Sequence, residues 1–189
     1  MVLENQSVRV LAICGSLRKD SYNKALLRAA QQLAPKTMSV ELYDELAAIP
    51  PYDDDVREAG FPSNVASLPE RVRDADALSF ATPEYNRSFS GVLKNAIDWV
   101  SRPPAQPFRG KPALVMGAGP GALGTALATY HLRQVLSVLY VHVLPGLEVL
   151  VGGAAAKFDG NGQLVDAPTR EFLQRSLADL ERHARRLSG

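Results

Sequence analysis

The stretch VRVLAICGSLRKDSYN, residues 8–23, decides the fold of this chain. Its first seven residues form a short apolar run that is typical of a buried β-strand, and the polar segment after them leads into a helix predicted over residues 24–34. A strand that opens directly into a helix is typical of a parallel β-α-β unit. We therefore expect strands and helices to alternate along the rest of the chain.

Short apolar runs and segments of helical period do alternate. Further strands are predicted at 40–43, 77–81, 113–116 and 139–143, and helices at 65–73, 91–100, 122–136 and in a C-terminal segment whose apolar side carries Leu173, Leu177, Leu180, Ala184 and Leu187. This pattern predicts an α/β fold with a doubly wound five-stranded parallel sheet and helices on both faces. Ligands of such sheets bind beyond the carboxyl ends of the strands, so the loops after residues 14, 81 and 116 are the candidate sites.

Composition excludes several classes of protein. The chain has 189 residues and a formal net charge of +1, which favours a single domain over residues 1–189 and argues against a partner that is a nucleic acid. Cys14 is the one cysteine, so an intramolecular disulfide and a cysteine-based zinc site are excluded, and the three scattered histidines favour no metal site. No apolar stretch approaches the length of a membrane span, and we expect a cytoplasmic protein with no membrane partner.

The loop after the first strand has the composition of a phosphate site. Ser16, Arg18, Ser21 and Asn23 offer hydrogen-bond donors at the start of a helix, where unpaired backbone N–H groups and the helix dipole attract anions. The alternative is that Ser21 or Asn23 serves only as the helix N-cap and that Arg18 is a solvated surface residue. Four suitable groups in one loop favour the phosphate interpretation.

The loop after the third strand could frame a flat heteroaromatic ring. It carries an aromatic side chain among polar residues and a proline that stiffens the backbone: Pro83, Glu84, Tyr85, Asn86 and Ser88. The alternative is an ordinary turn into the next helix, with Ser90 as the N-cap.

Three motifs carry a family resemblance. GSLRKDSYN (15–23), PEYNRSFSGVLKNAIDWVSRP (83–103) and GKPALVMGAGPGALG (110–124) closely resemble the NADPH-dependent FMN reductase family, a flavodoxin-like group that includes quinone, azo-dye and chromate reductases. The resemblance implies a flavodoxin-like fold, FMN as cofactor, NADPH or NADH as donor, a quinone-like acceptor and a homodimer or homotetramer.

The same resemblance assigns residues to the flavin. It implies that Ser16, Arg18, Ser21 and Asn23 hold the FMN phosphate, and that Pro83, Glu84, Tyr85, Asn86 and Ser88 border the isoalloxazine ring. Family members commonly have a serine where this chain reads Gly117-Ala118-Gly119, so backbone N–H groups at Gly117, Gly119 and Gly121 would serve the flavin instead.

The segment from Gly119 to Gly124 matches the pattern GxGxxG of dinucleotide-binding folds. Its position on the fourth strand argues against a second nucleotide fold, because that fingerprint belongs to the first strand of a β-α-β unit. We expect these glycines to let the backbone approach the edge of the flavin.

Other polar and aromatic residues favour structural roles. Asp53, Asp54 and Asp55 are predicted to form a solvated loop rather than a metal site, and Trp99 to lie in the core. Lys94 and Asp98 are predicted to form a surface pair. Tyr130 and His131 could face a subunit interface or serve packing.

The expected function is an FMN-dependent NAD(P)H oxidoreductase that works by ping-pong exchange. No side-chain acid or nucleophile stands out, as expected where a flavin carries out the chemistry. The alternatives are a flavodoxin-type electron carrier, which is usually strongly acidic, and a sensor or structural protein on the same fold. Arg87 could meet the 2′-phosphate of NADPH, but a solvated arginine is the favoured interpretation.

Overall fold

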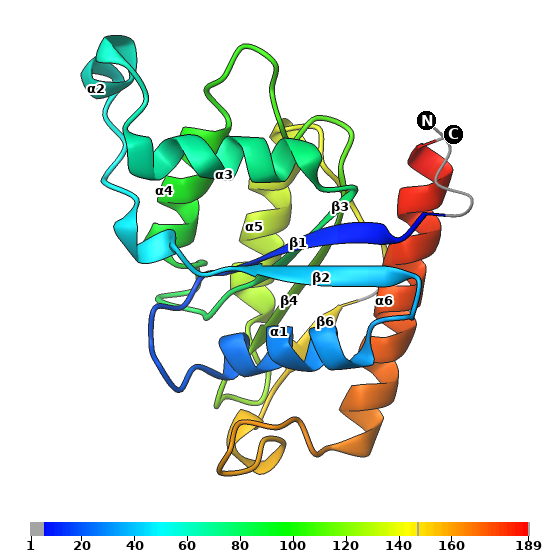
Figure 1. The fold of residues 1–189 in the computed structure, drawn as a ribbon. Coiled ribbons are helices and arrows are strands. Elements are labelled where there is room, and N and C mark those ends of the chain that lie inside the picture. Colours follow the sequence, from blue (N-terminus) through cyan, green and yellow to red (C-terminus); the bar gives the residue numbers. More distant parts are fainter. Residues whose placement is uncertain (1–5, 147, 189) are drawn as a thin grey trace.

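A computed structural model describes residues 6–146 and 148–188, which form one parallel sheet between two layers of helices (Figure 1). The strands run in the order β2-β1-β3-β4-β5, and β6 also pairs with β4. This order is that of flavodoxin-like folds, so the doubly wound α/β architecture predicted from the sequence is confirmed. The bounds are β1 Val8–Cys14, β2 Met38–Tyr43, β3 Ala77–Ala81, β4 Pro112–Ala118, β5 His142–Val143 and β6 Val149–Val151.

The strand count differs from the prediction, because two short strands share the fifth position of the sheet. β5 pairs with Pro112 and Ala113 at the start of β4, whereas β6 pairs with Met116–Ala118 at its end. Residues 139–143 were predicted as one strand, but Leu139 ends the preceding helix and Tyr140 has a φ of 60°. That left-handed residue turns the chain, so only two residues are left to pair as β5.

The helices cover the two faces of the sheet unequally. α1 (Tyr22–Leu33) and α6 (Ala167–Leu187) pack on one face, while α3 (Ser63–Asp74), α4 (Gly91–Val100) and α5 (Ala126–Val138) pack on the other (Figure 1). The predicted apolar side of α6 is confirmed for Leu173, Leu177, Leu180 and Ala184, which are fully buried, whereas Leu187 in the last turn is exposed. No helix in the described parts of the chain is both long and apolar enough to cross a bilayer.

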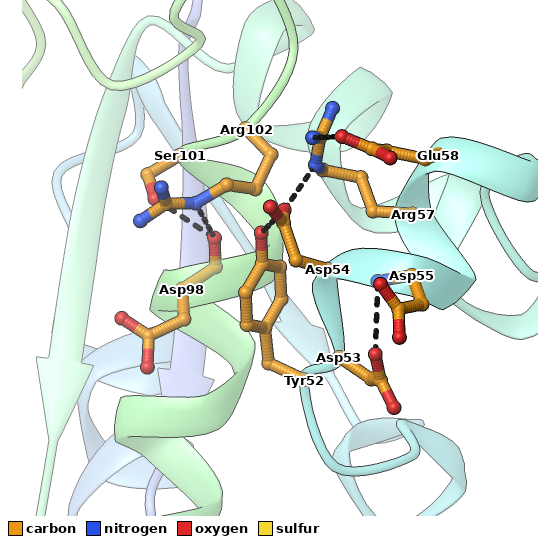
Figure 2. A network of polar contacts seen from close by, with 9 residues as sticks. All are labelled: Tyr52, Asp53, Asp54, Asp55, Arg57, Glu58, Asp98, Ser101 and Arg102. Carbon is orange, nitrogen blue, oxygen red and sulfur yellow. Dashed lines mark hydrogen bonds and ion pairs between the residues drawn. The ribbon is translucent and has the colours of Figure 1, made fainter.

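The three aspartates at 53–55 start a helix, so the prediction of a loop was wrong. Asp53 is the N-cap of α2 (Asp54–Ala59), and its carboxylate accepts a hydrogen bond from Asp55 N at 2.9 Å (Figure 2). Asp54 accepts hydrogen bonds from Arg57 Nε at 2.6 Å and Tyr52 Oη at 2.7 Å, which lower its pKa to about 2. Among the described residues, no group of three or more His, Cys, Asp and Glu is arranged to hold a metal ion.

The segment before α2 is fixed to α4. Pro50 O accepts hydrogen bonds from Trp99 Nε1 at 2.9 Å and Asn95 Nδ2 at 2.8 Å. Trp99 is fully buried, which confirms its predicted place in the core, and the pair between Lys94 and Asp98 forms at 2.8 Å. Two short 3-10 turns, η1 (Leu46–Ala48) and η2 (Ala154–Ala156), complete the described elements.

Candidate functional site

The loop between β1 and α1 places two predicted phosphate ligands at the start of the helix. Ser21 is the N-cap of α1, and its Oγ accepts hydrogen bonds from Asn23 N at 3.2 Å and Lys24 N at 3.4 Å. The hydroxyl proton of Ser21 is not used in these bonds, so the capping role leaves a donor for an anion. Ser16 lies in the same loop with a buried side chain, and Arg18 is exposed to solvent beside it.

Asn23 joins this loop to the end of β4. Its Nδ2 donates to Ala118 O at 3.0 Å, and its Oδ1 accepts from Ala118 N at 2.9 Å. Both residues are buried, so the amide satisfies two main-chain groups that water does not reach. Asn23 therefore holds the loop after β1 against the end of β4, a role that sequence reasoning missed. One amide hydrogen remains for a ligand, and the phosphate contact stays a prediction.

A tight turn in the loop after β3 presents Tyr85. Tyr85 and Ser88 exchange two backbone hydrogen bonds, of 2.9 and 3.0 Å, across Asn86 and Arg87. The two central residues have φ values of 51° and 67°, as a type I′ turn requires. Left-handed conformations of this kind cost roughly 1–3 kcal/mol each in non-glycine residues and concentrate at functional sites. Tyr85 is 56% exposed on this turn, so its ring is available to a ligand.

Glu84 and Ser88 hold the same loop against α5. Glu84 Oε2 accepts hydrogen bonds from Leu127 N at 3.0 Å and Ala128 N at 3.2 Å, and Ser88 Oγ lies 2.9 Å from His131 Nδ1. Thr125, the N-cap residue of α5, makes no side-chain cap bond, so Glu84 performs the capping from a different loop. The Glu84 carboxylate therefore points to α5, and any contact of this residue with a flavin ring remains a prediction.

Replacement of Glu84 by alanine is expected to lower the free energy of unfolding by about 1 kcal/mol, the usual effect of a lost helix cap. Urea denaturation followed by circular dichroism measures this. Glu84→Gln keeps an oxygen acceptor and should recover part of the loss. Equal stabilities of the alanine variant and the wild type would contradict the capping role.

Tyr130 and His131, on the exposed side of α5, both have partners within the chain. Tyr130 Oη donates a hydrogen bond to Glu148 Oε2 at 3.0 Å, which raises the pKa of the phenol. The ring of His131 packs edge-on against Phe89, with the centroids 5.3 Å apart. Both residues thus have local structural roles, and a subunit contact stays a prediction.

The glycines after β4 fall into two groups. A Cβ at Gly117 would lie 1.8 Å from Thr125 Oγ1 and 2.7 Å from Thr82 O, and a Cβ at Gly119 would lie 2.9 Å from Gly124 O. These two residues are therefore required by packing within the protein itself. Gly121 has no atom within 4 Å of the position of a Cβ, and it is exposed. Of the three, Gly121 is the one whose surroundings leave room for a ligand.

Close packing also brings the loops after β1 and β3 together. A Cβ at Gly15 would lie 2.8 Å from Ser90 Oγ and 3.0 Å from Thr82 Oγ1, so the two loops touch where β1 and β3 end. Thr82, Ser90 and Thr125 are buried, and their hydroxyl groups form a polar layer under the loops. Sequence reasoning assigned Ser90 only as an N-cap, which is confirmed, and missed the two threonines.

The site holds no activated side-chain nucleophile in the described residues. Cys14, at the end of β1, is buried as predicted, and burial raises the pKa of its thiol. A protonated thiol is a poor nucleophile. The arrangement offers instead anion donors in one loop, an exposed ring in a second and close-packed glycines in a third, all at the carboxyl edge of one sheet.

Comparison with known proteins agrees with this arrangement. Residues 8–156 match the family model described as NADPH-dependent FMN reductase. An NAD(P)H-dependent FMN reductase of Pseudomonas aeruginosa is 52% identical over 185 residues, which cover 98% of this chain and all of that protein. A quinone reductase of Escherichia coli is 42% identical over 171 residues, covering 89% of this chain and 91% of that one.

A solved structure shows the same fold. FerB, a flavoenzyme NAD(P)H:(acceptor) oxidoreductase from Paracoccus denitrificans, superposes with a TM-score of 0.86 at 36% identity, covering 95% of this chain and 98% of that one. The family expected from the three sequence motifs is thus confirmed over most of the chain. The chain belongs to the NADPH-dependent FMN reductase family.

Proposed function

We propose that this protein reduces a quinone-like acceptor with electrons from NAD(P)H, through bound FMN and by ping-pong exchange. The observation that carries the proposal is the contact of Gly15 with Thr82 and Ser90, which joins the anion-binding loop to the loop that presents Tyr85. A mononucleotide needs these two features side by side, one for its phosphate and one for its ring. The names of the reductases from P. aeruginosa and E. coli support the same activity.

The residues present fit FMN. Ser16, Ser21 and Arg18 supply donors for the phosphate, and Gly121 leaves open space where a backbone N–H can face a ligand. Asn23, Glu84, Gly117 and Gly119 hold the loops in place, whatever contacts they add. Pro83, Tyr85, Asn86 and Ser88 form the proposed border of the ring.

Bound FMN supplies the hydride acceptor and the electron carrier between the two substrates. The protein's own part is to bind and orient, because no acid or nucleophile lies among the candidate residues. Tyr85 is exposed on a turn that two backbone hydrogen bonds with Ser88 close, so its main chain is held without contact from the core. If donor and acceptor share one open face of the flavin ring, they must bind in turn, and this is the basis for the proposed ping-pong exchange.

Arg18→Ala is expected to weaken FMN binding by about 1.5–3 kcal/mol, the range for a hydrogen bond to a charged group. Titration of the apoprotein with FMN, followed by quenching of flavin fluorescence, measures the loss. Riboflavin has no phosphate, so its affinity should be the same for Arg18→Ala and the wild type. An equal loss for both flavins would contradict the phosphate role of Arg18.

Spectroscopy of the purified protein tests the proposed function. After addition of FMN the protein should show a bound-flavin spectrum, and NADPH under anaerobic conditions should bleach it. A quinone should then restore the colour and sustain turnover without any other protein. A flavodoxin-type carrier would bind FMN but show no steady-state oxidation of NAD(P)H, and a sensor or structural protein would take up no FMN.

We further propose that residues 1–189 form one domain, that the protein assembles as a homodimer or homotetramer, and that it works in the cytoplasm. The uninterrupted sheet, whose strands come from residues 8 to 151, supports the single domain. Sedimentation equilibrium of the FMN-bound protein measures the assembly directly.

A further inference from the structure

A cavity of about 240 Å³, called the side cavity below, lies between the first turns of α1 and the chain segment that leads into α6. One wall carries Arg18 and Ser21 from the loop after β1, and the opposite wall is the turn at residues 159–162. Figure 1 shows this turn in orange, beneath α1. Sites that enclose a whole small ligand usually have about 300–1,000 Å³, so the side cavity suits one part of a larger ligand.

We propose that the side cavity binds the adenosine monophosphate part of FAD, so that the site proposed for FMN also accepts FAD. FAD is FMN whose phosphate is joined to adenosine monophosphate, and its flavin half would occupy the loops already described. The inference therefore rests on the proposed function. It adds a second cofactor and assigns Arg28, which has no part in the proposed FMN contacts, to the second phosphate.

The side cavity adjoins the proposed phosphate site directly. Arg18 and Ser21, two of the proposed ligands of the FMN phosphate, also line the cavity. Ser21 Oγ accepts hydrogen bonds from Asn23 N and Lys24 N, which leaves its hydroxyl proton for a phosphate. Because the cavity begins at these two side chains, a second phosphate attached to the first has a space to enter.

Arg28 brings a second positive charge to the side cavity. It lies about two turns of α1 beyond Ser21, and helical side chains lean back toward the N-terminus of their helix. Its Nη2 lies 3.2 Å from the position that a Cβ on Gly162 would take, so the guanidinium rests against the opposite wall. Arg28 forms no ion pair within residues 6–146 and 148–188, so its charge is available to an anion.

Hydrogen bonds within the turn at 159–162 fix the opposite wall. Asp159 Oδ1 accepts from Asn161 N at 2.9 Å and from Gln163 N at 2.8 Å, and Gly162 N donates to Asp159 O at 2.9 Å. Gly162 has a φ of 73°, and the space that a side chain there would fill is taken by the Arg28 guanidinium. The wall is therefore formed by contacts of the protein itself, before any ligand binds.

The other side chains of the side cavity favour a nucleoside phosphate over a free anion. Two acids, Asp20 and Asp159, line it, and they repel an inorganic anion but can accept hydrogen bonds from ribose hydroxyl groups, as acids do in dinucleotide sites. Tyr22 packs against Phe158, with the ring centroids 5.5 Å apart, and presents an aromatic edge to the cavity. The amide of Asn161 both donates and accepts, which matches the polar edge of adenine.

Calorimetric titration of the apoprotein with FMN and with FAD tests the inference without any turnover. The wild type should bind the two flavins with similar affinity. Arg28→Gln should lower the affinity for FAD about tenfold, the equivalent of one charge-assisted hydrogen bond, and leave the affinity for FMN unchanged. Arg28→Lys keeps the charge and should recover part of the loss. Lys36→Gln removes an exposed charge just beyond α1 and is the matched control, with no change for either flavin.

The inference is overturned if Arg28→Gln weakens the binding of FMN and FAD equally, or of neither, or if the wild type binds FAD more than about tenfold less tightly than FMN. An unchanged affinity for FMN in Arg28→Gln also shows that the variant is folded. Binding of FMN without binding of FAD contradicts this inference alone. If neither flavin binds, the proposed function fails, and the inference fails with it.

Discussion

Gly117→Ala is expected to lower the free energy of unfolding by about 3 kcal/mol or more, above the usual effect of overpacking in a core. The added methyl group would lie 1.8 Å from Thr125 Oγ1 and 2.7 Å from Thr82 O. The threonine hydroxyl can rotate away, but Thr125 Cβ, at 2.9 Å, does not move with that rotation, and Thr82 O belongs to the main chain that leads into the loop of Tyr85. Accommodation therefore requires the third-strand loop to move away from β4.

This displacement should also weaken FMN binding, because Tyr85 is carried on the loop that must move. Urea denaturation of the apoprotein measures the stability, and fluorescence titration measures the affinity for FMN. Gly121→Ala is the matched control for the stability measurement, since no atom lies within 4 Å of its Cβ position. A Gly117→Ala variant as stable as Gly121→Ala would show that the close approach of β4 to Thr82 and Thr125 is wrong.

A second replacement refines this prediction. Thr125→Ala in the Gly117→Ala background removes the nearest of the three clashing atoms but leaves Thr82 O at 2.7 Å and the Cβ of residue 125 at 2.9 Å. It should recover part of the lost stability and little of the FMN affinity, because the contact with the main chain that leads into the loop of Tyr85 remains. Full recovery of both the stability and the FMN affinity would show that the effect of Gly117→Ala arises from the clash with the Thr125 side chain alone.

The elements that carry a long or strongly apolar pattern could be predicted from the sequence. β1, β3 and α4 have the predicted bounds, because their apolar runs end at polar or glycine residues on both sides. α2 could not be predicted, since no residue of it is buried and its start depends on a local hydrogen bond from Asp53. The split of the fifth strand depends on the left-handed conformation of Tyr140, for which the sequence carries no signal.

In the candidate site, too, some features could be predicted from the sequence and others could not. Residue types in the loops after β1 and β3 sufficed to propose both loops as parts of the site, because anion donors and an exposed aromatic ring have recognisable compositions. The roles of Asn23 and Glu84 could not be predicted, since each depends on a partner far away in the sequence, Ala118 and Leu127. Side-chain identity therefore predicts which loops form the candidate site, and tertiary contacts determine the structural role of each residue there.

Asn23→Ala is expected to destabilise the apoprotein by about 2–4 kcal/mol, because two buried main-chain groups would lose their partners. Ala118 N and Ala118 O are bonded to the Asn23 amide at 2.9 and 3.0 Å, and Ala118 is 3% exposed, so water does not readily replace the amide. The loss should be present without FMN, since the brace joins two parts of the protein itself. Urea denaturation of the apoprotein measures it.

Comparison with Ser16→Ala distinguishes a residue that holds the loop in place from one that binds the FMN phosphate. The Ser16 side chain is buried in the same loop but makes no hydrogen bond of its own to the described residues, so its removal should leave the stability of the apoprotein nearly unchanged and weaken only FMN binding. Asn23→Ala should instead lower the stability of the apoprotein and the affinity for riboflavin as well as for FMN, because the whole loop is released from β4. If Asn23→Ala behaves like Ser16→Ala, with a stable apoprotein and a loss confined to FMN, then Asn23 is a phosphate ligand and the brace contributes little.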